Sequence, residues 1–309
     1  MNCLTLRRLR RFVVLSLFLI CAVPGVHAGD ESLSRYAAPY LLKGVGARPR
    51  GMGNAFVALA NDTQAIYYNP AGLAFLKFAG LGSMYSPQGQ DQNLWSGEYF
   101  QPLGRFGGIG AGVIINEVGG IEGRADEFAP ASEINSREGA VLLSYGYAPG
   151  EEWSLGVTAK YLFHRFGGLT DNGRGQAFDL GGKWLVTAVP GLTLGAAAQN
   201  LGGSFRWSTG RTDPVLFVFK SGVAYRAASW LTALLDMDIR GDKAVRWHAG
   251  VEATKSVMAF RAGADHDHPT FGFGLTNPKA RVRLKFDYSF ELDPKGLDDV
   301  NRFSFTVRF

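Results

Sequence analysis

Most of this chain alternates between apolar and polar residues in segments of about ten residues, and no other feature constrains the fold as strongly. In "WSLGVTAKYLFH" the odd positions from Trp153 to Phe163 are apolar, while the even positions include Ser154 and Lys160. In "RVRLKFDYSFEL" the even positions are apolar and the odd positions are charged or polar. Because successive side chains of a β-strand point to opposite faces, each segment predicts a strand with one apolar and one polar face.

Fourteen segments of this kind follow one another between residue 78 and residue 309. They span 78–87, 93–101, 107–117, 137–147, 153–165, 175–187, 191–200, 215–226, 229–239, 243–253, 257–264, 269–276, 280–291 and 302–309. An even number of strands with lengths near ten residues suits a transmembrane β-barrel, in which the strands cross the bilayer at a tilt. A soluble sheet with one wet face also alternates, so the alternation does not decide between the two by itself.

The connections between the segments favour the barrel. The links after the even-numbered segments are short, such as "PLGRF", "APGEE" and "NPK". The links after the odd-numbered segments are mostly longer, including 118–135 and 201–214, with short exceptions near 240–242 and 265–268. An outer-membrane barrel has tight turns at one rim and longer loops at the other. The fold class we predict is therefore all-β: a transmembrane antiparallel β-barrel of fourteen strands over residues 78–309.

Aromatic residues gather beside the short links. They are Tyr147, Trp153, Trp184, Tyr225 and Trp230. If these links share one rim, the rings form a belt at a membrane interface. The alternative is that they are ordinary core aromatics.

The N-terminal segment predicts export. The first eleven residues contain four arginines, the apolar run 12–23 follows, and the small residue Ala28 closes the segment. This pattern is typical of a signal peptide, which we expect to span residues 1–28. The run is shorter than the roughly 20 residues that a spanning helix needs.

Removing residues 1–28 changes the charge of the chain. The full net charge of +5 falls to about +1, because 28 basic and 27 acidic residues remain. This balance does not indicate a nucleic-acid partner. Cys3 and Cys21 both lie within the same segment, so we expect neither a disulfide nor a cysteine-ligated metal, and no cofactor.

The last predicted strand also alternates. Phe303, Phe305 and Val307 lie on one face and would contact lipid, while the other face is charged or polar. Its backbone must pair with the first strand, because an open sheet edge in hydrocarbon leaves amides without partners. The terminal Phe309 resembles the signal that outer-membrane assembly machinery reads, so we expect that machinery to be a partner.

Residues 29–77 do not alternate and precede the first strand. Asn69 is placed to cap a short helix in "NPAGLAFL", and Pro70 suits the first helical position. Gly51 and Gly53 permit a tight backbone path. A fourteen-stranded barrel is wide enough to need filling or to leave a channel. We therefore predict that residues 29–77 form a plug, or hatch, with short helices.

The N-terminal stretch resembles a known family. "GARPRGMGNAFVALANDTQAIYYNPAGLA" is similar to the signature of the PorV/PorQ-type outer-membrane proteins, within the FadL-type superfamily of long-chain fatty-acid transporters (OMPP1/TodX-like). Asn69, Pro70 and Ala71 match the Asn-Pro-Ala of the family's hatch. Weaker likenesses lie in "AAAQNLGG", "SGVAYR", "RAGAD" and "LKFDYSF". The resemblance implies fourteen strands and a plug, and the shorter chain implies trimmed external loops.

The FadL resemblance implies passage of a hydrophobic small molecule across the outer membrane. Phe56, Tyr67 and Leu73 are the candidate ligand contacts in the plug, and the ligand would leave sideways through the wall. Gly110 and Gly112 are the candidate lateral gate, because glycine weakens a strand. The alternative is that these glycines face inward and make room for the plug.

Two other functions stay open. A PorV-like protein would dock secreted cargo in a type IX-like system, and a general porin would need an open lumen. An enzyme is not expected, because no Gly-x-Ser-x-Gly occurs and the histidines form no credible catalytic set. We interpret "DHDH" at 265–268 as a polar strand connection rather than a metal site. The expected partners are membrane lipid and either an apolar small molecule or secreted cargo.

Overall fold

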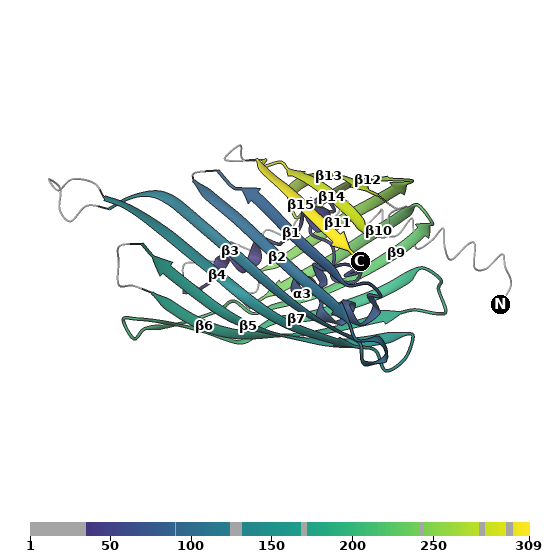
Figure 1. Ribbon diagram of the computed structural model, residues 1–309, viewed down its shortest axis with the longest axis horizontal. Coiled ribbons are helices and arrows are strands. Elements are labelled where there is room, and N and C mark those ends of the chain that lie inside the picture. The colour runs from purple at the N-terminus through teal and green to yellow at the C-terminus, as the bar shows by residue number, and fades with distance from the viewer. Residues whose placement is uncertain are drawn as a thin grey trace.

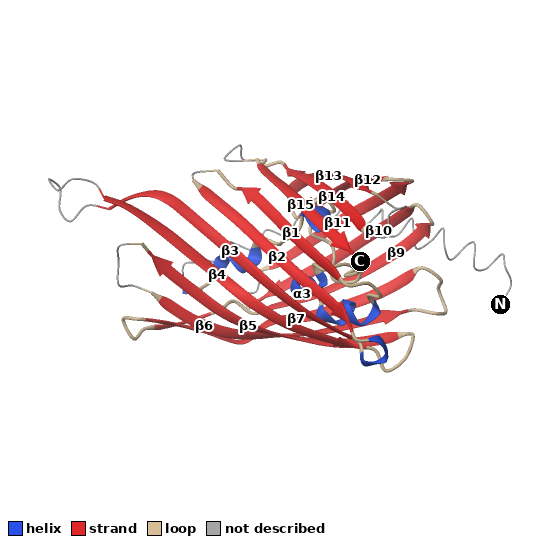
Figure 2. Ribbon diagram, in the orientation of Figure 1, coloured by secondary structure: helices blue, strands red, loops and turns tan. Residues whose placement is uncertain are grey.

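A computed structural model of the chain describes residues 35–89, 91–123, 132–167, 172–241, 244–277, 282–294 and 299–309. These residues form one closed sheet with short helical segments inside it (Figures 1 and 2). The predicted signal peptide, residues 1–28, lies outside the described residues. Within the described ranges, no helix is both long and apolar enough to cross a membrane.

The described part of the sheet contains fifteen strands in chain order. They are β1 (Gly80–Pro87), β2 (Gln92–Pro102), β3 (Gly108–Gly123), β4 (Ser132–Tyr147), β5 (Trp153–Phe166), β6 (Gly173–Leu185), β7 (Leu192–Trp207), β8 (Thr212–Pro214), β9 (Val218–Ala228), β10 (Leu231–Arg240), β11 (Val245–Lys255), β12 (Met258–Asp265), β13 (His268–Thr276), β14 (Arg283–Glu291) and β15 (Val300–Arg308). Fourteen of these strands form the wall. The three-residue β8 pairs only with the end of β7.

The wall closes where its first and last strands meet. β1 pairs antiparallel with β15, and Ser83 lies opposite Phe305. The remaining wall strands pair antiparallel with their neighbours, and the β6–β7 pairing completes the ring. In Figure 1 the yellow β15 lies beside the blue β1. The prediction of a fourteen-stranded antiparallel barrel is confirmed, and closure gives every wall strand two partners.

The two faces of the wall are reversed relative to those of a soluble protein. On β15, Phe305 is 59% exposed whereas Ser304 is fully buried. On β5, Leu155 and Val157 are exposed while Lys160 is buried. Apolar side chains therefore cover the outside and polar side chains line the inside, as a barrel in hydrocarbon requires.

The barrel has two rims that differ in their connections. We call one the turn rim; it carries the connections β2–β3, β4–β5, β6–β7, β9–β10, β11–β12 and β13–β14, together with the C-terminus. The opposite end is the loop rim. Trp153 and Trp184 lie opposite each other near the turn rim, and both are exposed, as are Tyr147 and Trp230. Tyr225 is only 1% exposed, so its predicted place in an exposed aromatic belt is wrong: protein covers its ring.

Three strands extend further toward the loop rim than the sequence predicts. β3 and β4 pair beyond the predicted boundary, with Ile121 opposite Ile134, and β7 runs to Trp207. Figure 1 shows β3 and β4 projecting past their neighbours. The added residues are rich in glycine and polar side chains. They continue the ladder because strand pairing needs only backbone groups, not an apolar face.

The segment before β1 lies inside the barrel. It contains η2 (Pro39–Leu42), α2 (Ala47–Arg50), α3 (Ala65–Tyr68) and η3 (Pro70–Phe75), drawn in blue within the red wall in Figure 2. A buried core joins Phe56, Tyr68 and Leu73 of this segment to Leu142 and Leu162 of the wall. We call residues 35–79 the plug.

Candidate functional site

Asn69 joins two parts of the plug to the wall. Its side-chain carbonyl accepts a hydrogen bond from the Ala71 amide at 3.1 Å, which caps η3 as expected of this residue before Pro70. Its side-chain amide donates to the carbonyls of Val57 at 2.9 Å and Gly182 at 3.0 Å. Asn69 is fully buried. The cap is visible in the sequence, but the bond to Gly182 of β6 depends on the tertiary fold.

Glycines of the wall let this motif approach closely. A Cβ at Gly156 would meet the backbone of Pro70 and Ala71, and a Cβ at Gly181 would meet the Asn69 side chain. Residues with side chains at these two positions of β5 and β6 would push η3 off the wall. The hatch motif is therefore seated against a smooth strip of wall.

Gly51 and Gly53 make a similar contact on the opposite wall. Gly53 has a φ of 64°, and its amide donates to the Thr270 hydroxyl at 2.9 Å. A Cβ at Gly53 would meet the carbonyl oxygens of Ala249 and Ala264. Glycine is needed here both for the left-handed backbone and for the close approach to the strands.

A buried ion-pair cluster links α2 to β11, β12 and β14. We call it the Arg48 cluster; it comprises Arg48, Asp62, Glu252, Arg261 and Asp287. Arg48 donates Nε and Nη2 to the two carboxylate oxygens of Glu252, each at 2.8 Å, and Nη1 to Asp62 at 2.6 Å. Burial acts to lower the pKa of Arg48, but Glu252 and Asp62 outweigh it and hold that pKa well above its ordinary value.

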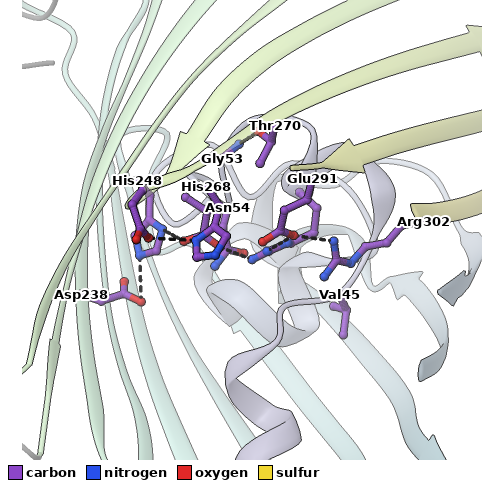
Figure 3. Close-up of polar contacts among 12 residues, drawn as sticks. Val45, Gly53, Asn54, Asp238, His248, His268, Thr270, Glu291 and Arg302 are labelled. Atoms are coloured by element: carbon purple, nitrogen blue, oxygen red, sulfur yellow. Dashed lines mark hydrogen bonds and ion pairs between the residues drawn. The ribbon is translucent and has the colours of Figure 1, made fainter. Parts of the chain in front are cut away.

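A second row of charges lies nearer the loop rim. Arg50 donates to Asp265 of β12 and to Glu291 of β14. Glu291 also accepts from Arg302 at 2.8 Å, and His248 lies 2.7 Å from Asp265. Figure 3 shows this row, with His248 at one end and Arg302 at the other. The plug is thus tied to β11, β12 and β14 by charged contacts.

Wall side chains also satisfy the irregular backbone of the plug. Asp236 of β10 accepts from the amides of Phe56 at 2.6 Å and Val57 at 2.7 Å. Lys183 of β6 donates to the carbonyl of Leu59 at 2.5 Å, and Gln199 of β7 donates to that of Tyr67 at 2.6 Å. Non-helical backbone at membrane depth is stable only where protein or water supplies such partners.

The predicted ligand contacts are packed inside the plug. Phe56, Tyr67 and Leu73 are all buried, and Phe56 makes an edge contact with Tyr68 at a ring separation of 5.3 Å. The structure brings the three residues into the same core. Their contact with a ligand stays a prediction.

Gly110 and Gly112 face the lumen beneath the plug. A Cβ at Gly110 would lie 2.7 Å from the Ile66 side chain, and one at Gly112 would lie 3.3 Å from it. Gly110 is paired with Phe100 of β2 and Ser144 of β4, so the ladder continues through this position. The absence of side chains at these two glycines leaves room for Ile66 of the plug. Opening of the wall at this point stays a prediction.

Solved structures with a similar fold include two toluene transporters and a FadL homologue. The Ralstonia pickettii toluene transporter TbuX matches at 15% identity and a TM-score of 0.55, over 87% of this chain and 98% of that one. The Pseudomonas putida toluene transporter TodX matches at 14% identity and 0.57, over 86% and 96%. A Pseudomonas aeruginosa FadL homologue matches at 11% identity and 0.57, over 86% and 98%.

The chain has a FadL/TodX-type barrel fold. No family model matches it, and no curated protein matches its sequence. At these identities the likeness concerns the fold alone. Membership of the FadL-type superfamily and of its PorV/PorQ branch both stay predictions.

An open hollow of about 390 Å³ lies at the turn rim of this FadL/TodX-type barrel. Leu59 of the plug forms one side, and Leu185, Val186, Pro190 and Leu192 form much of the other. No sequence pattern predicts this hollow. The apolar turn "LVTAVPGL" is the only local signal, and nothing in the sequence places Leu59 beside it.

Two other predicted positions, the segment 265–268 and Phe309, contact neighbouring parts of the protein. Asp265 of the "DHDH" segment pairs with Arg50 and His248, and His268 lies 2.9 Å from Asp267. Among the residues that the structure describes, no group of three or more potential ligands is placed to hold a metal ion. Phe309 donates its amide to the Ala79 carbonyl at 3.1 Å, and its ring is exposed at the turn rim.

Proposed function

We propose that this chain is an outer-membrane transporter that passes an apolar small molecule through a plugged barrel. The observation that carries the proposal is the apolar hollow between Leu59 of the plug and the wall. The fold, shared with two toluene transporters, supports the same class of substrate. The hollow is larger than a single-ring hydrocarbon and is lined by side chains that such a molecule would contact favourably.

The exposed outer face supports the membrane location. Exposed large apolar side chains lie on every wall strand except β7, from Leu81 on β1 to Phe305 on β15. In water such a surface would aggregate, whereas in hydrocarbon it is the stable arrangement. The turn rim faces the periplasm in this proposal, because outer-membrane barrels place their tight turns there. Phe309 then lies at the periplasmic rim, where assembly machinery would read it.

Transport requires the plug to move. The core around Phe56, Tyr67 and Leu73 is buried, so a ligand from the loop rim reaches these side chains only when the plug shifts. The Arg48 cluster and the charges around Arg50 oppose that shift. The ligand then passes to the hollow beside Leu59 or leaves through the wall near Gly110.

Uptake of labelled toluene by Gram-negative cells that carry the protein tests the proposal. Cells are needed because a bare phospholipid bilayer passes small apolar molecules unaided. Leu59→Glu places a charge in the hollow and is expected to slow initial uptake several-fold. Leu59→Met and the exposed turn-rim control Leu103→Glu are expected to match the parent. Equal uptake by the Leu59→Glu cells and the parent cells would remove the hollow from the route.

Two further measurements separate the alternative functions. A general porin would give a large steady conductance in a planar bilayer, whereas the filled lumen is expected to give little. A cargo-docking protein would co-purify with secreted protein or a secretion-channel subunit, and native mass spectrometry of gently extracted complexes would detect either. A bound apolar molecule in the same spectrum would favour transport.

A further inference from the structure

Four neighbouring strands carry arginine on their outer face at the loop rim. Toward the turn rim, the outer faces of β4, β5 and β6 carry exposed apolar side chains, among them Val141, Leu155 and Phe178. The arginines are Arg137 on β4, Arg165 on β5, Arg174 on β6 and Arg206 on β7, and all four are exposed. On β1, β2 and β15, the described outward positions near this rim are Pro87, Asn93 and Asn301. The basic cluster therefore covers one sector of the wall.

The strand register places these arginines in opposing pairs. Arg137 lies directly opposite Arg165, and Arg174 lies directly opposite Arg206. Like charges in opposite positions of neighbouring strands destabilise a sheet. Glu117 offsets Arg137 at 3.1 Å. Arg165, Arg174 and Arg206 have no carboxylate partner among the described residues, so the protein itself leaves this repulsion largely uncompensated there.

An open hollow of about 860 Å³ lies at the same place. Its lining includes Arg165, Arg174 and Arg206 together with the aromatic rings of Phe163 and Trp207. Three arginines and two aromatic residues thus line the same hollow. A guanidinium group binds phosphate oxygens through two parallel hydrogen bonds. Arginine therefore fits a phosphate group better than lysine, whose ammonium group is a point charge.

The depth of the cluster identifies the form in which the phosphate arrives. Phe163, two residues before Arg165, and Phe178, four residues after Arg174, belong to the apolar outer face. At about 3.3 Å per residue, the arginines lie within roughly 7–13 Å of the apolar surface. That is the level of lipid headgroups when the apolar face lies in hydrocarbon.

We infer that this cluster binds the phosphates of a phosphorylated glycolipid in the outer leaflet, whose acyl chains lie along the apolar face of β5 and β6. The inference rests on the proposed membrane location. It adds a fixed lipid to the barrel at the loop rim, on the outside of the wall. The lipid compensates the opposed arginines and holds the tall β4–β7 sector in place.

Lipid titration of the purified protein in zwitterionic detergent tests this inference. Diphosphoryl lipid A is the probe, bound lipid is counted by native mass spectrometry, and the melting temperature is followed by tryptophan fluorescence. The variant is Arg174→Gln combined with Arg206→Gln. The matched control is Arg105→Gln combined with Lys255→Gln, which removes the same charge from exposed positions at the turn rim.

The parent and the control are expected to bind the lipid equally, and the Arg174/Arg206 variant at least about ten-fold more weakly. Without lipid, that variant is expected to melt at the same or a higher temperature than the parent, because the cross-strand repulsion is gone. Dephosphorylated lipid A and inorganic phosphate are expected to give no protection. Equal lipid binding by variant and parent would overturn the inference, and so would equal protection by inorganic phosphate. A protein that stays soluble without detergent would instead refute the membrane location before any lipid is added.

Discussion

Arg48 of the plug and Glu252 of β11 form a two-bond ion pair across the lumen, with both nitrogen–oxygen distances at 2.8 Å. The two residues are 204 positions apart in the chain, and both are buried. Glu252 also accepts from Arg261 at 2.7 Å, so one carboxylate bonds to two guanidinium groups. This contact ties the plug to the wall through two charge-assisted hydrogen bonds.

Removal of the Glu252 carboxylate is expected to loosen the plug. Glu252→Ala leaves Arg48 and Arg261 buried without their shared partner, at a cost of about 3–5 kcal/mol. The expected result is frequent channel openings in a planar bilayer, where the parent is quiet. Glu117→Ala is the control, because it breaks an exposed pair with Arg137 worth at most about 1 kcal/mol. A quiet Glu252→Ala channel would show that other contacts hold the plug.

Loss of the Asn69 amide is expected to destabilise the hatch motif. Asn69→Ala removes the cap of η3 and leaves the carbonyls of Val57 and Gly182 without this donor. A buried group left without a partner costs about 1–3 kcal/mol. Limited proteolysis of the plug measures the change. Asn93→Ala, which breaks one partly buried bond to Tyr85, is expected to leave the digestion rate close to that of the parent.

Alanine substitutions at two glycines with similar φ values distinguish the cost of a strained backbone from the cost of a steric clash. Gly53 and Gly104 have φ values of 64° and 61°. A Cβ at Gly53 would meet wall carbonyls, whereas a Cβ at Gly104 would meet nothing within 4 Å. Gly104→Ala is expected to cost about 1 kcal/mol from φ alone, and Gly53→Ala distinctly more. Similar melting temperatures for the two variants would mean that the plug can withdraw from β11 and β12 at little cost.

Acid is expected to release the plug. Burial acts to raise the pKa of Asp62, but Arg48, Lys285 and Arg308 together outweigh it and hold the pKa below the ordinary value of 3.8. A carboxyl with a lowered pKa stabilises the folded state above its unfolded pKa, and this stability is lost as the pH falls through the folded value. Proteolysis of the plug by an acid-active protease is therefore expected to rise steeply below about pH 4. Asp62→Asn should already be susceptible near neutrality and show a weaker acid dependence; an unchanged profile would exclude Asp62 from the response.

A triple variant distinguishes the two roles proposed for Gly110 and Gly112, a lateral gate in the wall or space for the plug. Gly110→Val with Gly112→Val is expected to reduce toluene uptake by cells in either case, because both side chains would press on Ile66. Adding Ile66→Ala returns the space to the plug. Uptake that stays low in the triple variant would support a gate at β3. Recovery of uptake would assign the two glycines to packing alone.

Local patterns in the sequence predicted the wall strands. They did not predict the parts of the strands that lack an apolar face. Alternation placed every wall strand, because the two faces of a strand follow from the backbone alone. It missed the outer ends of β3, β4 and β7, where pairing continues without an apolar face. Asn69 and Pro70 indicated the start of η3, because capping is a contact between near neighbours in the chain.

The sequence by itself determined that this chain forms strands with one apolar and one polar face, and that these strands follow an irregular segment. The tertiary structure alone decided which residues meet: Arg48 with Glu252, Leu59 with the turn after β6, and Arg174 with Arg206. The physical reason is that strand faces depend on a two-residue repeat. Contacts across the lumen and along the rim depend instead on strand register and ring closure, which all fourteen wall strands set together.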